Sequence, residues 1–489
     1  MARFTAVIDF GSNSVRLVIF ERTSRFGFKV IHESKSRVRV GEGAYQKNGI
    51  LQQEPMDRAF LALTGFNSII KSFKVRKVLA IATSALRDAP NKNIFINRVR
   101  KNLGINIKVI NGETEALLGG IACANLLRLE KSGVTIDIGG GSTEFSLIEN
   151  RKVLSTYSLN LGTVRLKELF ENSSDLNSAK LYIHNELSKL PLEFRNNLII
   201  GIGGTIRALS KIVQKRSKYP LKRVHGYMYE YKHQKEFFDE VIGMPKESLE
   251  RIGFKPERVD VIRWGVLIFR EVIQLFQANT IITSGVGIRE GLFLKDNLRS
   301  MKSRYPENFN PSIRNILDDF QVPNDKASKN LFRVANELFE IVNEHLEISQ
   351  YRKTVEYISK LVEVGVKIDF YGNTKNGFQM ILNRFIYGVS HEESLLVAIA
   401  VRFSHRNEIS EKIYIEFGEL LPDIKTLKAI HSIIYLSKIL TLDYSYVKKM
   451  EFEFVEDILI VKIFDKALFY AISEKLEKLE FLDVNIVNS

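Results

Sequence analysis

The chain has 489 residues, of which 45% are hydrophobic and 26% are charged, and its formal net charge is +14. These values are typical of a soluble globular protein of roughly three domains, and they exclude a disordered, collagen-like or disulfide-stapled chain. The single cysteine, Cys123, excludes an internal disulfide, and no apolar run is as long as a membrane span. We therefore expect a cytoplasmic protein without a membrane segment.

The positive charge is concentrated in the first three-fifths of the chain. Residues 1–300 contain 47 Lys and Arg against 29 Asp and Glu, a net charge of +18, whereas residues 301–489 have a net charge of −4. Such a field attracts polyanions, which include nucleic acid, acidic lipid and a polyphosphate-like substrate. The charge alone does not choose among them.

The first part of the chain alternates short β-branched runs with helical patterns. Residues 5–9 and 15–20 predict two strands joined by a Gly-Ser-Asn-Ser turn. Further elements are expected in the order helix, strand, helix, strand, at residues 54–72, 78–82, 90–102 and 107–110.

A second strand–turn–strand pattern follows at residues 134–148, where Gly-Gly-Gly-Ser-Thr separates two apolar runs. A third strand, at 198–202, leads into Gly-Gly-Thr and a helix that starts near Ile206. Both hairpins open with Asp-x-Gly, at Asp9 and at Asp137. The repetition predicts an internal duplication into two related α/β lobes whose turns face each other. The alternative is that Gly-rich hairpins recur by chance.

The residue pattern of the chain changes near residue 301, where two X-Pro pairs precede a long helical pattern that continues to about 445. Residues 451–463 alternate as strands do, and a helix is expected near 466–479. The expected domains are two α/β lobes and a mostly helical module with a small mixed end, at residues 1–125, 126–300 and 301–489.

The glycine-rich turns are suited to anions, because their backbone N–H groups are free and no side chain blocks the approach. Asp9 and Asp137 would repel a phosphate there unless a divalent metal lay between them. The sequence therefore suggests Mg²⁺, with Glu144 as a third oxygen ligand across the hairpin. Turn-capping or solvated carboxylates are the alternative for each acid.

Two further strand ends carry polar side chains. Glu113 and Glu115 lie in the first turn of an expected helix, where one of them could act as a general base for water, and the spacing does not choose between them. Thr83, Ser84 and Arg87 could hold a phosphate. A capped helix start with a solvated arginine is the alternative for that segment.

A basic run favours a long anionic substrate, and a solvated charged face is its alternative. The run comprises Lys211, Lys215, Arg216, Lys218, Lys222 and Arg223. His225, beside it, is assigned no chemistry and could be a surface histidine.

Together, eight segments resemble the exopolyphosphatase/guanosine pentaphosphate phosphatase family of the actin, sugar kinase and heat-shock ATPase superfamily. Their residues are 7–14 (Val-Ile-Asp-Phe-Gly-Ser-Asn-Ser), 82–89, 111–116, 136–144 (Ile-Asp-Ile-Gly-Gly-Gly-Ser-Thr-Glu), 161–166, 201–209, 256–260 and 284–291. The resemblance covers residues 1 to about 300. It implies an α/β fold of two ribonuclease H-like (actin-like ATPase) lobes facing a cleft.

The resemblance also implies roles for single residues. Glu115 would activate the attacking water, and Asp137 and Glu144, with Asp9 beside them, would hold Mg²⁺. The phosphate-binding residues would be Ser12, Asn13, Thr83, Ser84, Arg87, Gly139, Gly140, Gly141, Ser142, Thr143, Gly203, Gly204 and Thr205.

The function implied is that of an exopolyphosphatase, which releases orthophosphate processively from the end of inorganic polyphosphate. Guanosine pentaphosphate is a further candidate substrate. An ATP-dependent kinase or ATPase of the same superfamily, and a non-catalytic polyanion-binding protein, are the alternatives.

The C-terminal part resembles, more weakly, the HD-like helical module of longer family members, without the His-Asp pair of metal-binding relatives. We interpret it as a dimerisation and substrate-channel element. We expect a homodimer that binds neither a membrane nor a specific nucleic acid.

Overall fold

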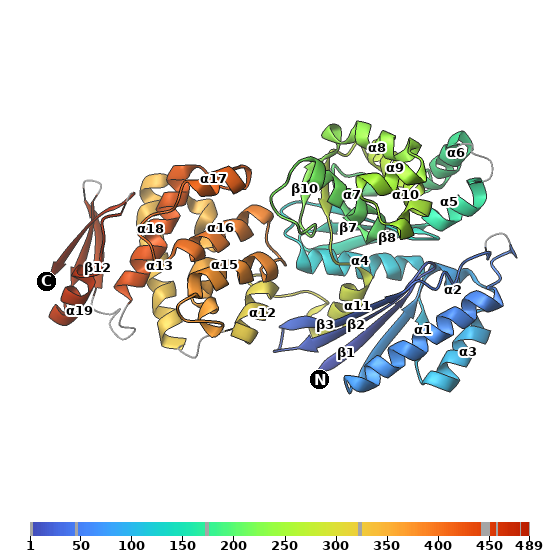
Figure 1. The fold of residues 1–489 in the computed structure, drawn as a ribbon, viewed down its shortest axis with the longest axis horizontal. Coiled ribbons are helices and arrows are strands. Elements are labelled where there is room, and N and C mark those ends of the chain that lie inside the picture. Colours follow the sequence, from blue (N-terminus) through green and yellow to red (C-terminus); the bar gives the residue numbers. More distant parts are fainter. Residues whose placement is uncertain are drawn as a thin grey trace. The chain divides into compact units, whose positions relative to one another are not determined.

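The computed structural model describes residues 3–44, 47–171, 176–320, 325–441, 450–455, 458–479 and 481–488. The chain divides into two compact units, Met1–Pro311 and Ser312–Ser489 (Figure 1). In the part of the chain that the structure describes, no helix is both long and apolar enough to cross a membrane.

The first lobe of the N-terminal unit is built on a five-stranded sheet of order β3-β2-β1-β4-β5. Ala80 and Ala82 of β4 face a core with helices α1 and α3, whereas Ile81, between them, packs against the opposite layer. Both faces of the central strands are therefore buried, which explains their continuous apolar runs. The elements are β1 (Phe4–Phe10), β2 (Val15–Arg22), β3 (Phe28–Ser36), α1 (Gln53–Ser72), β4 (Lys77–Ala82), α2 (Ser84–Asp88), α3 (Lys92–Leu103) and β5 (Ile107–Val109).

The second lobe has a six-stranded sheet of order β10-β11-β9-β6-β7-β8. In both lobes an antiparallel hairpin is followed by two parallel neighbours, so β8-β7-β6-β9-β11 repeats the arrangement of β3-β2-β1-β4-β5. The expected internal duplication is confirmed, with β10 as an added antiparallel edge. The strands are β6 (Gly133–Ile138), β7 (Thr143–Glu149), β8 (Lys152–Leu159), β9 (Leu198–Ile202), β10 (Met228–Glu230) and β11 (Thr280–Thr283).

One face of the second sheet packs in a large core with the helices that connect its strands. The buried side chains of α10, among them Trp264 and Phe269, lie at the centre of this core. The helices of this lobe are α5 (Thr163–Phe170), α6 (Leu176–Leu187), α7 (Gly203–Arg216), α8 (Lys235–Gly243), α9 (Lys246–Ile252) and α10 (Pro256–Phe276).

Two helices, α4 (Gly112–Leu126) and α11 (Ile288–Asn297), pack against each other between the two sheets (Figure 1). A Cβ atom on Gly291 would lie 1.8 Å from the carbonyl oxygen of Leu118, so only glycine permits this approach. A Cβ on Gly112 or Gly120 would likewise collide with side chains of β7 and β8. Helix α4 is thus pressed onto the second sheet, and its first turn has a fixed position.

The C-terminal unit is mostly helical, as expected, with a small mixed end. The alternating stretch 451–463 is confirmed as an antiparallel hairpin, β12 (Met450–Val455) and β13 (Ile458–Ile463), and β14 (Asp483–Asn488) adds a parallel strand. Helix α19 ends earlier than the sequence suggests. The helices are α12 (Pro311–Phe320), α13 (Asp325–Leu346), α14 (Arg352–Leu361), α15 (Asn373–Arg384), α16 (His391–Phe403), α17 (Lys412–Phe417), α18 (Ile424–Leu440) and α19 (Lys466–Ser473).

The boundary between the two units follows Pro311, whereas the change in composition near residue 300 predicts an earlier boundary. Tyr305 is 2% exposed and packs against Phe26 and Phe309, and its backbone N–H donates to the side chain of Asn125 over 2.9 Å. These contacts hold residues 301–309 in the N-terminal unit. The last few positions of the expected helical stretch, to residue 445, lie outside the described residues.

Candidate active site

A cavity of about 190 Å³ lies between the two lobes of the N-terminal unit and is lined by both Asp-x-Gly turns. Five carboxylates line it: Asp9 at the end of β1, Asp137 at the end of β6, Glu144 on β7, Glu115 on α4 and Glu257 on α10. The antiparallel register of β6 and β7 places Asp137 opposite Glu144. The cavity therefore gathers the acids that the sequence singled out.

The two turns have the same backbone geometry and touch each other. The N–H of Gly11 donates to Ser14 O over 3.1 Å, and the N–H of Gly139 donates to Ser142 O over 2.9 Å. A Cβ on Gly140 would lie only 3.1 Å from the Cβ of Ser12, so the second turn has to stay free of side chains where it meets the first.

The third turn, at Gly203-Gly204, has no side chain at either position. Gly203 has φ of +87°, and a Cβ there would lie 2.5 Å from the Oδ1 atom of Asp137. A Cβ on Gly204 would lie 2.3 Å from a guanidinium nitrogen of Arg258. The missing side chains leave space for a carboxylate and a guanidinium beside the backbone of this turn.

Glu115 enters the cavity because of the position of α4. Its partner in the first turn, Glu113, is exposed, and the turn is capped by Asn111, whose side chain accepts from the N–H of Thr114. Ser158 of β8, against which Gly112 packs, donates to Glu144 Oε1 over 3.0 Å. Glu115 and Glu144 therefore line the same cavity.

Burial and mutual repulsion shift the carboxyl groups toward their neutral forms. Burial raises the pKa of Glu115 well above its usual range, and the nearby Glu144 raises it further. Burial also raises the pKa of Glu144, and it raises the pKa of Asp137 to about 6. The pKa of Asp9 is raised by burial, against the opposing effect of Arg289 and Arg16. An ionised Glu115 is thus a stronger base than an ordinary glutamate.

Arg87 lies at the edge of the cavity and bridges the lobes. Its Nη1 is 3.1 Å from Glu115 Oε2, and its Nη2 donates to Ser142 Oγ over 3.4 Å. Arg165 makes the reciprocal contact, with Asp88 at 3.3 Å and the carbonyl of Gly141 at 2.9 Å.

Most of the expected phosphate-binding residues line the cavity. They are Ser12, Asn13, Thr83, Ser84, Gly139, Gly140, Ser142, Gly203, Gly204 and Thr205. Ser12 and Ser84 are joined through their hydroxyl oxygens, 2.9 Å apart. Gly141, Thr143 and Arg87 are not among the lining residues, and the buried Thr143 hydroxyl donates instead to the carbonyl of Leu161.

The basic run does not line this cavity. Three of its residues lie in the C-terminal half of α7 and three in the segment that follows, and all are exposed except Arg223, which is half-buried. Arg216 stacks over the ring of Phe237 and lies 4.0 Å from Glu240. The run thus forms a charged face of the second lobe outside the cavity, and the binding of a polyanion by Lys211, Lys215, Arg216, Lys218, Lys222 and Arg223 stays a prediction.

His225 is buried rather than on the surface. One of its ring nitrogens is 3.0 Å from the carbonyl oxygen of Leu126, and the other accepts from the N–H of Gly285 over 3.0 Å. Burial lowers the pKa of His225 to about 4. It is a neutral structural histidine.

The positive charge of the cavity comes from side chains to which the sequence alone assigned no role. They are Arg16, Lys35, Arg37, Arg207, Arg258 and Arg289. Glu33 on β3 holds two of them, with Arg289 at 2.6 Å and Arg16 at 3.4 Å. The sequence could have identified three of them, since Arg207, Arg258 and Arg289 lie within the segments that carry the family resemblance.

The donor chemistry of the cavity suits a hard cation, because buried carboxylate oxygens that raise one another's pKa gain from an added positive charge. However, no three acidic, histidine or cysteine side chains among the described residues are arranged so that they could hold an ion together. The expected set of Asp9, Asp137 and Glu144 is thus not assembled as a closed site. Mg²⁺ commonly takes one or two carboxylates and completes its shell with phosphate oxygens and water, and the residues present fit such a site.

Comparison with known proteins gives a consistent result over the N-terminal unit. The model of the "Ppx/GppA phosphatase family" matches residues 18–300. A bifunctional 3-dehydroquinate synthase/phosphatase of Fusobacterium nucleatum is 31% identical over 57% of this chain, which spans only 44% of that relative. An exopolyphosphatase 2 of Mycobacterium tuberculosis is 29% identical over 55% of this chain and 89% of its own length.

One relative matches beyond the N-terminal unit. A guanosine-5′-triphosphate,3′-diphosphate pyrophosphatase of Pseudoalteromonas translucida is 26% identical over 84% of this chain and 82% of its own length. Among solved structures, the Ppx/GppA family member of Aquifex aeolicus aligns with a TM-score of 0.54 and 30% identity, over 62% of this chain and 99% of that one.

Proposed function

The chain belongs to the Ppx/GppA phosphatase family, and we propose that it hydrolyses the terminal phosphoanhydride bond of inorganic polyphosphate and releases orthophosphate, one unit after another. The observation that carries this proposal is Glu115, a largely buried carboxyl with a raised pKa that lines a cavity between two glycine-rich turns. The similarity to an exopolyphosphatase supports the substrate.

The terminal phosphate would be held between the turns. Their glycines allow phosphate oxygens to approach the backbone, and Ser12 and Ser84 offer hydroxyl groups from the first lobe. Arg16, Arg207 and Arg289 add positive charge where the transferring group carries negative charge. Arg87, now paired with Glu115, can turn to the phosphate when the substrate enters.

Glu115 would take a proton from a water molecule in line with the terminal phosphorus. A bond forms between the water oxygen and phosphorus, the bond from phosphorus to the bridging oxygen breaks, and the shortened chain leaves as an anion. The proton stays on Glu115 until solvent removes it. A raised pKa helps the acceptance of this proton but requires that Glu115 be ionised at the start.

Asp137 and Glu144, with Asp9 beside them, would hold Mg²⁺ together with oxygens of the substrate. When bound, the ion would neutralise negative charge on the phosphoryl group that is transferred. Without the ion, the same carboxylates would repel a phosphate. Their presence in a phosphate-binding cavity therefore favours a bound cation.

Guanosine pentaphosphate is a second candidate substrate. The similarity to a guanosine-5′-triphosphate,3′-diphosphate pyrophosphatase extends over 84% of this chain and so reaches into the C-terminal unit. The same cavity would hold its terminal phosphate. We also propose, by analogy with the family alone, a cytoplasmic homodimer in which the C-terminal unit contributes to the substrate channel.

The test is orthophosphate release from long-chain polyphosphate and from guanosine pentaphosphate, with and without Mg²⁺. Glu115→Gln keeps the shape of the side chain but removes the base, so turnover should fall by about 10²–10⁴ with substrate affinity nearly intact. Glu113→Gln is the matched control in the same helical turn, and it should leave turnover unchanged. Equal small effects of the two changes would contradict the role of Glu115. ATP-dependent transfer to an acceptor, without hydrolysis of either compound, would favour a kinase.

A further inference from the structure

A second cavity of about 260 Å³ lies beside the first. The two cavities share four lining residues, Ser12, Asn13, Arg37 and Val261, so they adjoin each other. The first lobe contributes the segment 37–43 to its wall, and the second lobe contributes α5 and α10. A substrate whose end lies in the first cavity can therefore extend into the second.

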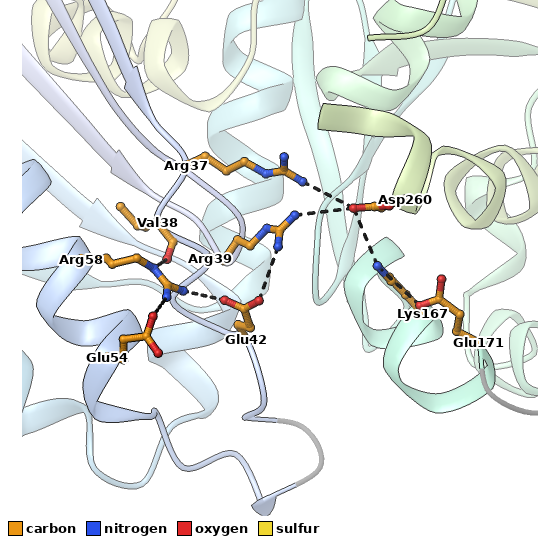
Figure 2. Close-up of polar contacts among 9 residues, drawn as sticks. All are labelled: Arg37, Val38, Arg39, Glu42, Glu54, Arg58, Lys167, Glu171 and Asp260. Atoms are coloured by element: carbon orange, nitrogen blue, oxygen red, sulfur yellow. Dashed lines mark hydrogen bonds and ion pairs between the residues drawn. The ribbon is translucent and has the colours of Figure 1, made fainter. Parts of the chain in front are cut away.

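Three cations in this wall converge on a single oxygen atom (Figure 2). Asp260 Oδ2 is 3.5 Å from Arg39, 3.9 Å from Arg37 and 3.9 Å from Lys167. Arg37 and Arg39 come from the first lobe, and Lys167 comes from α5 of the second. The other oxygen of the carboxylate, Oδ1, is 3.2 Å from Lys246. Both lysines also contact Glu171, Lys167 at 3.5 Å and Lys246 at 3.7 Å. Asp260 is thus the carboxylate that all four cations, from both lobes, have in common.

The three contacts to Oδ2 are longer than charge-assisted hydrogen bonds, which measure about 2.7–2.9 Å. One oxygen cannot satisfy three donors that approach from two sides. A phosphate group presents several oxygens in a tetrahedral arrangement and can take one donor on each. Burial alone would raise the pKa of Asp260, but Lys246, Lys167 and Arg39 outweigh it, so that the pKa is lowered and the group stays ionised.

The segment that carries these arginines has a fixed position relative to the first turn. The N–H of Arg39 donates to Asn13 O over 3.0 Å, and the N–H of Gly41 donates to Ser12 O over 3.2 Å. Arg39 is held in the left-handed region, with φ of 46°, which is unfavourable for a residue other than glycine. The acid Glu42 on this segment is paired with Arg58 as well as Arg39 (Figure 2). The backbone of Arg39 is thus held beside the first turn.

We propose that the second cavity is an anion subsite for a phosphate group of the polyphosphate chain that lies away from the bond being cleaved. When no phosphate is bound in this cavity, its cations contact the carboxylate of Asp260. Arg39 and Lys167 bind the incoming group, and Asp260 gives up both. The choice of polyphosphate as the occupant rests on the proposed function, whereas the anion subsite itself does not.

Binding of long-chain polyphosphate and of pyrophosphate, measured by calorimetry at one salt concentration, tests the subsite. The full chain carrying Glu115→Gln is used so that hydrolysis is slow during the measurement. Arg39→Gln and Lys167→Gln should each weaken the binding of long chains about tenfold, which is typical for loss of a charge-assisted contact. Pyrophosphate, which is short enough for the first cavity, should bind with unchanged affinity. Asp260→Asn should tighten the binding of long chains several-fold.

Arg98→Gln is the matched control, because Arg98 carries the same charge, contacts Asp57 and Phe60, and does not line either cavity. The proposal is overturned if Arg39→Gln and Lys167→Gln behave as Arg98→Gln does. It is also overturned if Asp260→Asn weakens binding, since Asp260 would then only hold the lobes together.

The two proposals can fail separately. If the unaltered chain releases no orthophosphate from polyphosphate but the binding pattern holds, the anion subsite stands and the proposed function fails. If orthophosphate is released and all variants bind long chains equally, the function stands and the subsite fails.

Discussion

Arg16 and Glu144 occupy equivalent positions in the two lobes. Arg16 faces Asp9 across the β1–β2 hairpin in the same register in which Glu144 faces Asp137 across the β6–β7 hairpin. The duplicated frame therefore presents an acid–base pair to the cavity from one side and two acids from the other. The cation belongs to the phosphate-binding side of the proposed site, and the two acids belong to its metal-binding side.

Arg16→Gln should raise the KM for polyphosphate about tenfold or more, because it removes a charge from the cavity and leaves Glu33 with Arg289 alone. Arg3→Gln is the control, since Arg3 is an exposed arginine paired with Glu21 at the far end of the same hairpin. Steady-state kinetics of both variants, at equal ionic strength, distinguish them. An unchanged KM for Arg16→Gln would remove Arg16 from the binding site.

Gly203→Ala should abolish activity, because its Cβ would displace the carboxylate of Asp137. It should also cost about 1–3 kcal/mol in the free energy of unfolding, since φ of +87° is unfavourable for alanine. Gly253→Ala provides the control: Gly253 also has a positive φ, of +115°, but nothing lies within 4 Å of its added Cβ. That variant should lose stability and keep turnover, as urea unfolding and orthophosphate release will show. Full activity of Gly203→Ala would show that the reaction does not depend on the position of the Asp137 carboxylate.

Glu115→Gln should stabilise the ligand-free protein at high pH. Burial raises the pKa of Glu115 in the folded state above its unfolded value, so the protein binds more protons when folded, and its stability falls as the pH rises through the folded pKa. Glutamine removes this loss. In the absence of divalent ions, the variant should melt at a higher temperature than the unaltered protein at pH 8 and at about the same temperature at pH 5. A difference that is constant with pH would contradict the raised pKa.

Asp137→Asn should lower turnover, and excess Mg²⁺ should partly restore it, because one charged ligand is lost while the cavity stays open. The measurement is a Mg²⁺ titration of activity together with Mg²⁺ binding by calorimetry. Asp260→Asn, which alters an acid outside the proposed metal site, is the control and should leave the Mg²⁺ requirement as it is. Full activity of Asp137→Asn at limiting Mg²⁺ would overturn the metal assignment.

A fragment ending at Pro311 should fold and retain hydrolysis of short polyphosphates, since every residue of the site precedes its end. A fragment ending at residue 300 loses the buried Tyr305 and its bond to Asn125. It should be less stable by about 3 kcal/mol or more, the cost typical of losing a large buried aromatic side chain. Thermal melting of the two fragments checks this, and equal melting temperatures would show that residues 301–311 do not stabilise the unit.

The sequence by itself predicted the two hairpins, the duplication and most of the turn residues. These features are local. A strand–turn–strand unit such as residues 134–148 places Asp137 opposite Glu144 through contacts within fifteen residues of the chain, and Asp-x-Gly specifies its turn whatever surrounds it. The alternation of residue types at 451–463 predicted strands for the same reason, since a hairpin pairs segments that are neighbours in the sequence.

The tertiary structure decided which side chains share the cavity. Glu115 rather than Glu113 faces it because Gly112, Gly120 and Gly291 allow α4 to press against β7, β8 and α11, contacts that join segments far apart in sequence. The same long-range packing directs Arg207 and Arg289 inward from α7 and α11, and it leaves the dense basic run at residues 211–223 exposed outside the cavity. Charge density along a sequence does not reveal the direction of side chains, because direction depends on what each helix is packed against.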